Sequence, residues 1–256
     1  MDKFSLAIIL FLISFYSKAQ WNLINQDSLL LEVSDVHFFD ENNGIVCGQI
    51  SHGHGFVLKT YDGGVTWPDT ATNVSVCSSF SFLGDSKGFT GGGDGVTYKT
   101  VDSGLTWTQT SNSSSGIDFD GIHFFNDSVG LIKSYFHSVW KTNDEGNNWT
   151  SVAYVQKSQH FYDRNVNPFH SINDSTLLVV GNGVFKTTNR GDSWIRLNSD
   201  TTRFYRSITM KNSQEGFAVG NNGALLRTTD AGNNWTYDSI SNQDLQELNL
   251  KNTKTA

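Results

Sequence analysis

Three aspartates, Asp118, Asp120 and Asp163, stand in polar segments between apolar runs and are the candidates for acid–base chemistry. Hydrolysis of a glycosidic bond uses two carboxyl groups about 5–10 Å apart, flanking the bond that breaks. The chain is acidic, with 25 Asp and Glu against 18 Lys and Arg, so composition alone places carboxylates in loops. Glycoside hydrolysis is therefore an alternative to a binding function, and no catalytic residue is assigned.

A second group of side chains has the chemistry of a binding surface. The candidates are Arg203, Phe204, Tyr205 and Arg206, joined by Tyr162 and Arg164. Arginine and tyrosine dominate the binding energy of protein interfaces. Two arginines on an acidic protein can also bind a peptide that carries a carboxylate. The alternative is a solvated loop in which Phe204 packs inward.

The histidines provide too few ligands to predict a metal site. His52 and His54 lie in a Gly-rich segment, and a zinc site needs more protein ligands than these two. His37, His123 and His170 occupy one register of a repeated pattern. They either face a central channel or pack between repeats, and packing is favoured because the residue type at this register varies freely. We predict no metal and no other cofactor.

An eight-residue motif, repeated five times, indicates which elements position these residues. In each copy Thr is followed by Asp or Asn, then by Gly, and the copy ends in Trp. The copies are Thr60–Trp67, Thr100–Trp107, Thr142–Trp149, Thr187–Trp194 and Thr228–Trp235. Successive tryptophans are 40, 42, 45 and 41 residues apart. A period of about 40–45 residues is typical of one four-stranded blade of a β-propeller.

The motif is typical of a tight turn between the third and fourth strands of a blade. Its carboxylate can accept backbone N–H groups of its own turn, its Gly permits positive φ, and its Trp packs on the sheet. Asn189 keeps the acceptor without the charge, which favours a structural role over catalysis or calcium binding. The predicted structural residues are Asp62, Trp67, Asp102, Trp107, Asp144, Trp149, Asn189, Trp194, Asp230 and Trp235.

The rest of each repeat predicts strands. Short apolar and β-branched runs bounded by Gly and Asn, such as Val36–Phe39 and Phe56–Thr60, favour strands joined by tight turns. No segment after the N-terminus shows helical periodicity. The predicted fold class is all-β, a β-propeller of four-stranded antiparallel blades with five recognisable blades. The motif turns would share one rim, and the variable loops, including 156–168, would lie on the other.

The two ends of the chain predict part of a sixth blade. Trp21–Ile24 resembles the strand after each motif, and Leu248–Lys251 aligns with Ile208–Lys211, the innermost strand of the fifth blade. A sixth blade therefore starts and stops before its second strand. The ring is either incomplete or the reading frame is truncated. Truncation is favoured, because an open propeller leaves unpaired, aggregation-prone edges.

The N-terminus predicts export. Residues 4–16 are almost wholly apolar, and Ser17–Ala19 supplies small residues before Gln20. This is the pattern of a signal peptide over residues 1–19, and the apolar run is short for a bilayer span. The domain division is a signal peptide (1–19) and a propeller (20–256), located in the periplasm or outside the cell. The alternative is an uncleaved membrane anchor.

The charge of the chain limits the classes of partner that it can bind. A formal net charge of −7 argues against nucleic acid, whose phosphates need a surplus of Lys and Arg. Nothing after the N-terminal segment predicts membrane insertion of the mature chain.

Cys47 and Cys77 could pair in an oxidising compartment. Both could equally be small buried hydrophobic residues, so the disulfide is left open.

The five copies resemble the Asp-box, or BNR-type, motif of a class of β-propellers. Sialidases of that class need an arginine triad. This chain has only six arginines, and none precedes Arg164, so the first three blades contribute no arginine and a sialidase is not favoured. The compact spacing, with Gly216–Gly220 followed by Leu225–Asp230, is most similar to the photosystem II stability/assembly factor family. That resemblance implies a non-catalytic docking platform with a protein or peptide partner. Carbohydrate recognition or hydrolysis is the second prediction.

Overall fold

The computed structural model describes residues 31–50, 54–71, 74–112, 118–134, 138–155, 168–197 and 202–245. The predicted signal peptide (1–19), the strand at 21–24 and the sixth-blade strand at 248–251 lie outside these ranges. The described residues form an all-β fold of five four-stranded antiparallel sheets. The predicted fold class is confirmed for the five blades, and the sixth stays a prediction.

The sheets follow one another along the chain. The first contains β1 (Leu31–Phe38), β2 (Gly44–Ile50), β3 (His54–Thr60) and β4 (Asp69–Ala71). The second contains β5 (Cys77–Leu83), β6 (Lys87–Gly92), β7 (Val96–Thr100) and β8 (Thr108–Asn112). The third contains β9 (Phe119–Phe124), β10 (Gly130–Ser134), β11 (Ser138–Thr142) and β12 (Thr150–Tyr154). The fourth contains β13 (Phe169–Ser171), β14 (Leu177–Gly181), β15 (Gly183–Thr187) and β16 (Ile195–Arg196). The fifth contains β17 (Tyr205–Met210), β18 (Gly216–Gly220), β19 (Ala224–Thr228) and β20 (Thr236–Ser239).

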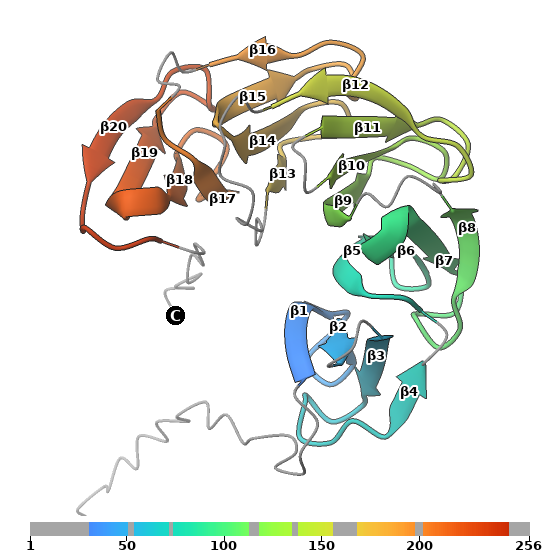
Figure 1. Ribbon diagram of the computed structural model, residues 1–256. Helices are drawn as coiled ribbons and strands as arrows, with labels where there is room; N and C mark the ends of the chain where they lie inside the picture. The colour runs from blue at the N-terminus through green and yellow to red at the C-terminus, as the bar shows by residue number, and fades with distance from the viewer. Residues whose placement is uncertain are drawn as a thin grey trace, which may run out of the picture.

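The five sheets stand as blades around an arc (Figure 1). In each blade the first strand in sequence faces the centre and the fourth lies outside. The first and fifth blades are the two ends of the arc. Helix within the described residues is confined to two 3-10 turns, η1 (Gly93–Gly95) and η2 (Asn221–Gly223), which join second to third strands.

The hydrophobic core lies between neighbouring blades. One cluster joins Ile45 and Val57 of the first blade to Tyr98 and Trp107 of the second, all nearly inaccessible to solvent. Equivalent clusters lie at the later junctions. A blade has two apolar faces and neither is stable in water, so each blade depends on its neighbours for burial.

A disulfide reinforces the first junction. Cys47 on β2 and Cys77 on β5 are bonded through their Sγ atoms, with their Cα atoms 5.8 Å apart. The bond joins two blades and closes a segment of 30 residues. The sequence left open whether these cysteines pair, because it does not show that they face each other across a junction.

The motif turns lie between the third and fourth strands, and all five have the same hydrogen bonds. In each, the threonine hydroxyl donates to the Asp or Asn Oδ1 (2.7–3.0 Å) and accepts the Gly N–H (2.8–3.0 Å). Each Trp Nε1 donates to the carbonyl of the motif Gly (3.0–3.1 Å). The acidic or amide side chain is therefore used inside its own turn.

Turn hydrogen bonds lower the pKa of the exposed motif aspartates. The Thr66 hydroxyl and backbone N–H lower the pKa of Asp62 to about 2. The Asn234 backbone and side chain lower the pKa of Asp230 to about 2. Both carboxylates are ionised at neutral pH and are held as acceptors.

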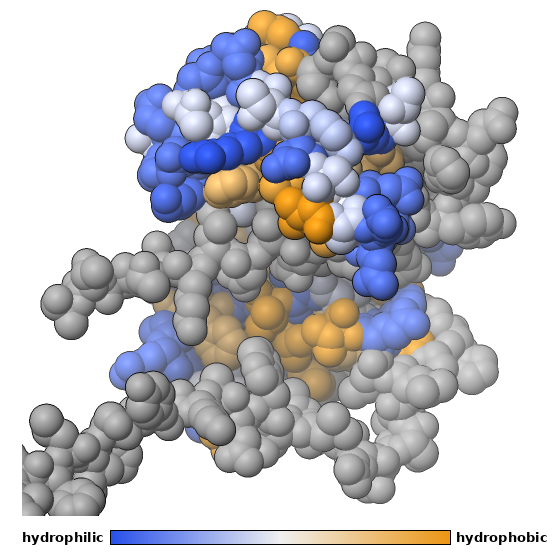
Figure 2. Space-filling model, turned by 90° about the vertical axis from the view of Figure 1, so that its left-hand side faces the viewer, coloured by the Kyte–Doolittle hydropathy of each residue, from blue (hydrophilic) through white to orange (hydrophobic). Residues whose placement is uncertain are grey.

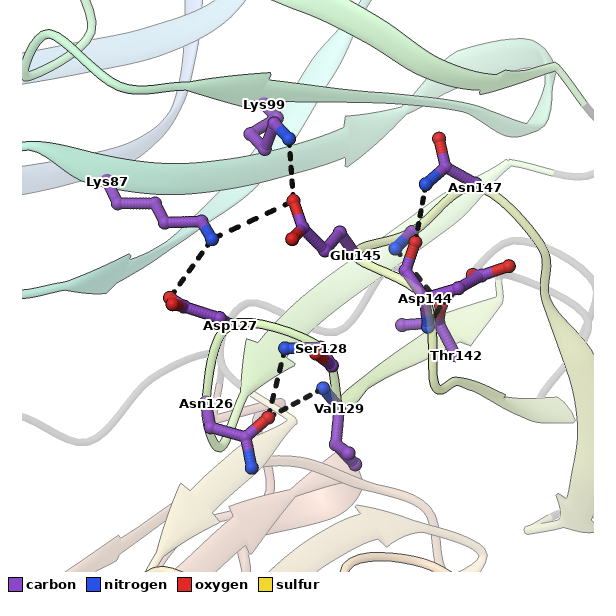
Figure 3. Close-up of polar contacts among 11 residues, drawn as sticks. Lys87, Lys99, Asn126, Asp127, Ser128, Val129, Thr142, Asp144, Glu145 and Asn147 are labelled. Atoms are coloured by element: carbon purple, nitrogen blue, oxygen red, sulfur yellow. Dashed lines mark hydrogen bonds and ion pairs between the residues drawn. The ribbon is translucent and has the colours of Figure 1, made fainter.

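A lysine just before each of the first four motifs connects consecutive blades. Lys59 Nζ donates to the Ser103 carbonyl in the next motif turn at 2.9 Å. Lys99 Nζ lies 2.6 Å from Glu145 Oε2, and Lys87 joins the same carboxylate and Asp127 (Figure 3). Two further contacts follow the same pattern, from Lys141 to Asp192 and from Lys186 to the Ala231 carbonyl and Asn233.

Candidate functional site

The innermost strands surround a cavity on the inner side of the arc. Its volume is about 580 Å³. It is lined by Val33, Ser34, Asp35, Val36, His37, Ser79, Phe80, Ser81, Phe82, Gly121, Ile122, His123, Phe124, Pro168 and Phe169. These residues come from β1, β5, β9 and the start of β13, and include the ends of those strands that lie opposite the motif turns. We call this the central pocket.

A repeated β-bulge shapes the pocket wall. In β1, β5, β9 and β17 the pairing with the second strand shifts by one residue near the start of the strand. The extra residues are Ser34, Ser78, Asp120 and Arg206. A bulge redirects a side chain and bends the strand, so one local irregularity is repeated in four of the blades.

The hydroxyl and carboxyl groups of the pocket wall already hold neighbouring blades together. Asp35 Oδ2 accepts the backbone N–H of Phe80 at 2.8 Å. Ser79 Oγ accepts the N–H of Ile122 at 3.0 Å, and Ser81 Oγ accepts that of Phe124 at 2.8 Å. Asp35 is the one carboxylate of the described lining, and its oxygens serve structure.

The three histidines at one register lie between blades. His37 stacks on Phe82 of the second blade, with ring centroids 4.8 Å apart. Burial, and to a lesser extent the nearby His170, lower the pKa of His123 to about 4. Burial also lowers the pKa values of His37 and His170. All three imidazoles are therefore neutral at pH 7.

The predicted packing of these histidines is only partly satisfied. His123 Nε2 is buried and has no hydrogen-bond partner among the described residues. A buried polar atom without a partner costs about 1–3 kcal/mol. A bound group that offers a hydrogen bond to this atom would remove that cost. His37 and His123 both line the pocket and also pack against neighbouring residues, so each predicted alternative describes part of their environment.

The aspartates considered for hydrolysis are engaged elsewhere. Asp120 is buried and forms an ion pair with the buried Lys133, 3.0 Å from its Nζ. Asp118 Oδ1 accepts the N–H of Asp94 in η1 at 3.0 Å. Asp163 lies outside the described residues. The structure therefore does not bring a free pair of carboxylates together from this group.

The predicted arginine and aromatic hot spot is largely buried. Phe204, Tyr205 and Arg206 are 3%, 0% and 7% exposed. Tyr205 begins β17, and Arg206 is a bulge residue that donates to Asn221 at 2.7 Å and pairs with Asp244 at 3.2 Å. Arg203 is half-buried, with its guanidinium carbon 3.9 Å from the Tyr237 ring centroid. Phe204 packs inward, as in the alternative prediction, but the segment is not a solvated loop, because Tyr205 and Arg206 are buried in β17.

The remaining predictions concern two further binding residues, a metal site and a membrane span. Tyr162 and Arg164, the remaining predicted binding residues, lie outside the described residues, as does His52. Among the residues that are described, no cluster of three or more His, Cys, Asp or Glu could hold a metal ion. In the same residues no helix is long and apolar enough to cross a membrane.

Comparison with family models and with curated proteins gives no match. Solved structures do match. A GH74 enzyme from Niastella koreensis has a TM-score of 0.60 at 18% identity, covering 81% of this chain and 38% of that one. The WD40 propeller domain of Doa1 has a TM-score of 0.57 at 13% identity, covering 85% and 72%.

The photosystem II assembly factor resemblance has a counterpart among these matches. YCF48 bound to a D1 peptide matches at 18% identity, covering 82% of this chain and 81% of that one, with a TM-score of 0.43. That TM-score is too low to support a conclusion, so the fold assignment rests on the GH74 and WD40 structures. At these identities the matches show the fold alone: the chain is a β-propeller of four-stranded antiparallel blades.

Proposed function

We propose that this protein is an exported, non-catalytic β-propeller that binds a peptide segment of another protein in the central pocket. The observation that carries the proposal is the chemistry of the pocket wall. It combines neutral imidazoles, phenylalanine rings and one unpartnered buried His123 Nε2. A peptide backbone is neutral, carries both donors and acceptors, and can present apolar side chains to the rings.

The same wall argues against hydrolysis. Acid–base catalysis at a glycosidic bond requires two carboxyl groups that reach the substrate. Among the described lining residues Asp35 is the single carboxylate, and it accepts backbone N–H groups of Val36 and Phe80. The Asp120 carboxylate faces the Lys133 ammonium group. We therefore propose a binding function in preference to glycoside hydrolysis.

Carbohydrate binding is the second candidate, and the phenylalanine rings of the pocket support it. Neutral sugars pack against aromatic rings and exchange hydrogen bonds with serine and histidine side chains. The GH74 structures show that this fold can support glycosidase activity, although the chain spans only 38% of the N. koreensis enzyme. Fold similarity alone does not transfer that activity.

Two observations support export. The signal-peptide pattern of residues 1–19 is one. The other is the Cys47–Cys77 bond, because structural disulfides persist in oxidising compartments outside the cytosol. Together they favour a periplasmic or extracellular location for the propeller.

The test compares peptide and glycan binding with two matched variants. Val33 lines the pocket and is 60% exposed, whereas Val101, on the rim of the motif turns, is 65% exposed. Peptides selected from a displayed library on the wild-type chain would be measured against Val33→Glu and Val101→Glu. We expect Val33→Glu to weaken binding about tenfold or more (about 1.4 kcal/mol) and Val101→Glu to leave it unchanged.

Three results would contradict the proposal. Equal affinities of both variants would show that the peptide binds outside the pocket. Binding of glycans, with no binding of peptides, would favour the second candidate. Turnover of a glycoside by the wild-type chain would contradict the non-catalytic assignment.

A further inference from the structure

The fifth blade repeats the junction features of the other blades on a side where the described residues place no neighbour. Arg227 stands at the position of Lys59, Lys99, Lys141 and Lys186, each of which contacts the next motif turn. Its side chain is 54% exposed, and it forms a long ion pair, 3.6 Å, with Glu215 of its own blade. Among the described residues, no following motif turn meets the Arg227 side chain as the following turns meet the four lysines.

The apolar surface on the same side is also incompletely covered. Phe217 occupies the same position in its second strand as Phe89, Ile45 and Leu131 do in theirs. Each of the four residues pairs with the innermost-strand residue that lies eight positions earlier in the sequence. Those three side chains are 0–1% exposed, whereas Phe217 is half-buried. Figure 2 views the open side of the arc and shows hydrophobic surface both on the fifth blade above and on the first blade below.

The chain leaves the fifth blade along the path by which it enters the third. Asp118 Oδ1 accepts the N–H of Asp94 in η1 at 3.0 Å, immediately before the innermost strand β9. Asp244 Oδ1 accepts the N–H of Asn222 in η2 at 2.9 Å, and Arg206 fixes its other oxygen. Asp94 and Asn222 have the same positive φ, 59° and 53°. Asp244 thus takes the place of Asp118.

This equivalence sets a register for the residues that follow. It places Leu248 at the position of Ile122 and Leu250 at that of Phe124. The sequence alignment of Leu248–Lys251 with Ile208–Lys211 gives the same register independently, because Ile122 and Ile208 are equivalent by strand pairing. Apolar and polar residues alternate from 248 to 251, as expected for a strand with one face against a blade.

The receiving strand has the side chains that this register requires. Ser79 and Ser81 on β5 accept the N–H groups of Ile122 and Phe124. Ser207 and Thr209 stand at the same two positions of β17. In the second junction Phe89 stacks on Phe124 with centroids 3.5 Å apart, and Phe217 would meet Leu250 in the same way.

We propose that the open face of the fifth blade is a docking surface for residues 246–251 of this chain, which form the innermost strand of a sixth blade. Leu248 and Leu250 cover Phe217 and its neighbours, and the hydroxyl groups of Ser207 and Thr209 accept their backbone N–H groups. This surface is distinct from the central-pocket function.

Hydrogen–deuterium exchange of the full chain tests the docking. We expect the amides of residues 248 and 250 and of β18 to exchange at least about tenfold more slowly than those of residues 253–256. Leu248→Asp should remove that protection in both segments. Asn249→Asp adds the same charge one residue away, on the opposite face of the strand, and should preserve the protection. Leu250→Ala is a milder second variant that should raise exchange in the same two segments.

The outcomes separate the possible occupants. Exchange of residues 246–251 at the rate of an unstructured chain would overturn the proposal, as would equal effects of Leu248→Asp and Asn249→Asp. A second copy on this face would instead give a concentration-dependent dimer that Phe217→Asp dissociates and Leu248→Asp leaves intact. Peptide binding to the pocket is measured separately, so failure of one proposal does not imply failure of the other.

Discussion

Asn189 occupies a position that aspartate holds in the other four motif turns, and its turn has the same framework of hydrogen bonds. Its Oδ1 accepts the Thr187 hydroxyl at 3.0 Å and the Ser193 N–H at 2.9 Å. Where Asp62 accepts the Thr66 hydroxyl, Asn189 instead donates from Nδ2 to Ser193 Oγ at 2.9 Å. The turn needs an oxygen acceptor at this position, and it does not need a charge.

His123 provides a prediction about acid stability. Its pKa falls from 6.5 to about 4 on folding, so the unfolded chain binds a proton first as the pH falls. Folding stability is then complete above pH 6.5 and is lost as the pH falls from 6.5 toward 4. We expect His123 to account for about 2 kcal/mol of the difference in unfolding free energy between pH 7 and pH 5.

Urea unfolding of wild type and His123→Gln at these two pH values measures that contribution. Glutamine does not titrate, so the variant should lose less stability between them. His37 and His170 also have lowered pKa values and will keep part of the pH dependence. Identical pH profiles of the two proteins would show that His123 does not titrate differently in the folded and unfolded chains.

At the scale of elements, each motif turn connects two levels of the fold. Within the blade, backbone N–H groups of the turn donate to the loop between the first and second strands, as Ser103 does to the Ser86 carbonyl at 2.9 Å. Between blades, the turn receives the basic side chain of the preceding blade, as Glu145 receives Lys99. The repeat is therefore a unit of assembly as well as a unit of sequence.

Thr142→Val tests the turn at a buried hydroxyl group. Thr142 is 1% exposed, and its hydroxyl accepts the Gly146 N–H at 3.0 Å and donates to Asp144 at 2.8 Å. Valine has the same shape but leaves that N–H without its acceptor. We expect a loss of about 1–3 kcal/mol in unfolding free energy by urea denaturation. Thr108→Val, at an exposed strand position, is the matched control, and an equal loss there would contradict the argument.

At the scale of the whole molecule, the arc depends on junctions that lie far apart in sequence. The Cys47–Cys77 bond fixes the first of them, at one end of the arc. Among the described residues the first blade packs against one neighbour in place of two, so it buries less apolar area and is expected to open first. A covalent link at that junction opposes this opening.

The disulfide and the export proposal can be checked on one sample. Intact-mass analysis of the protein from the cell envelope or medium should show a chain that begins at Gln20 and lacks both thiol hydrogens. Cys47→Ala/Cys77→Ala should lose about 2–4 kcal/mol of stability in urea unfolding, because the closed segment limits the unfolded chain. Free thiols in the exported protein, or an unchanged unfolding midpoint, would contradict the expectation.

The sequence alone determined the all-β class, the five blades and the motif turns, because strand alternation and turn chemistry are local patterns that recur every forty or so residues. It also placed three histidines at one register. Local patterns do not show which side chains meet across a junction. The tertiary structure decided that Arg206 is a bulge residue held by Asp244, and that Asp120 is neutralised by Lys133. It also decided that Asp35, the one carboxylate among the described lining residues of the central pocket, accepts backbone N–H groups, since burial and partner choice depend on blades that are distant in sequence.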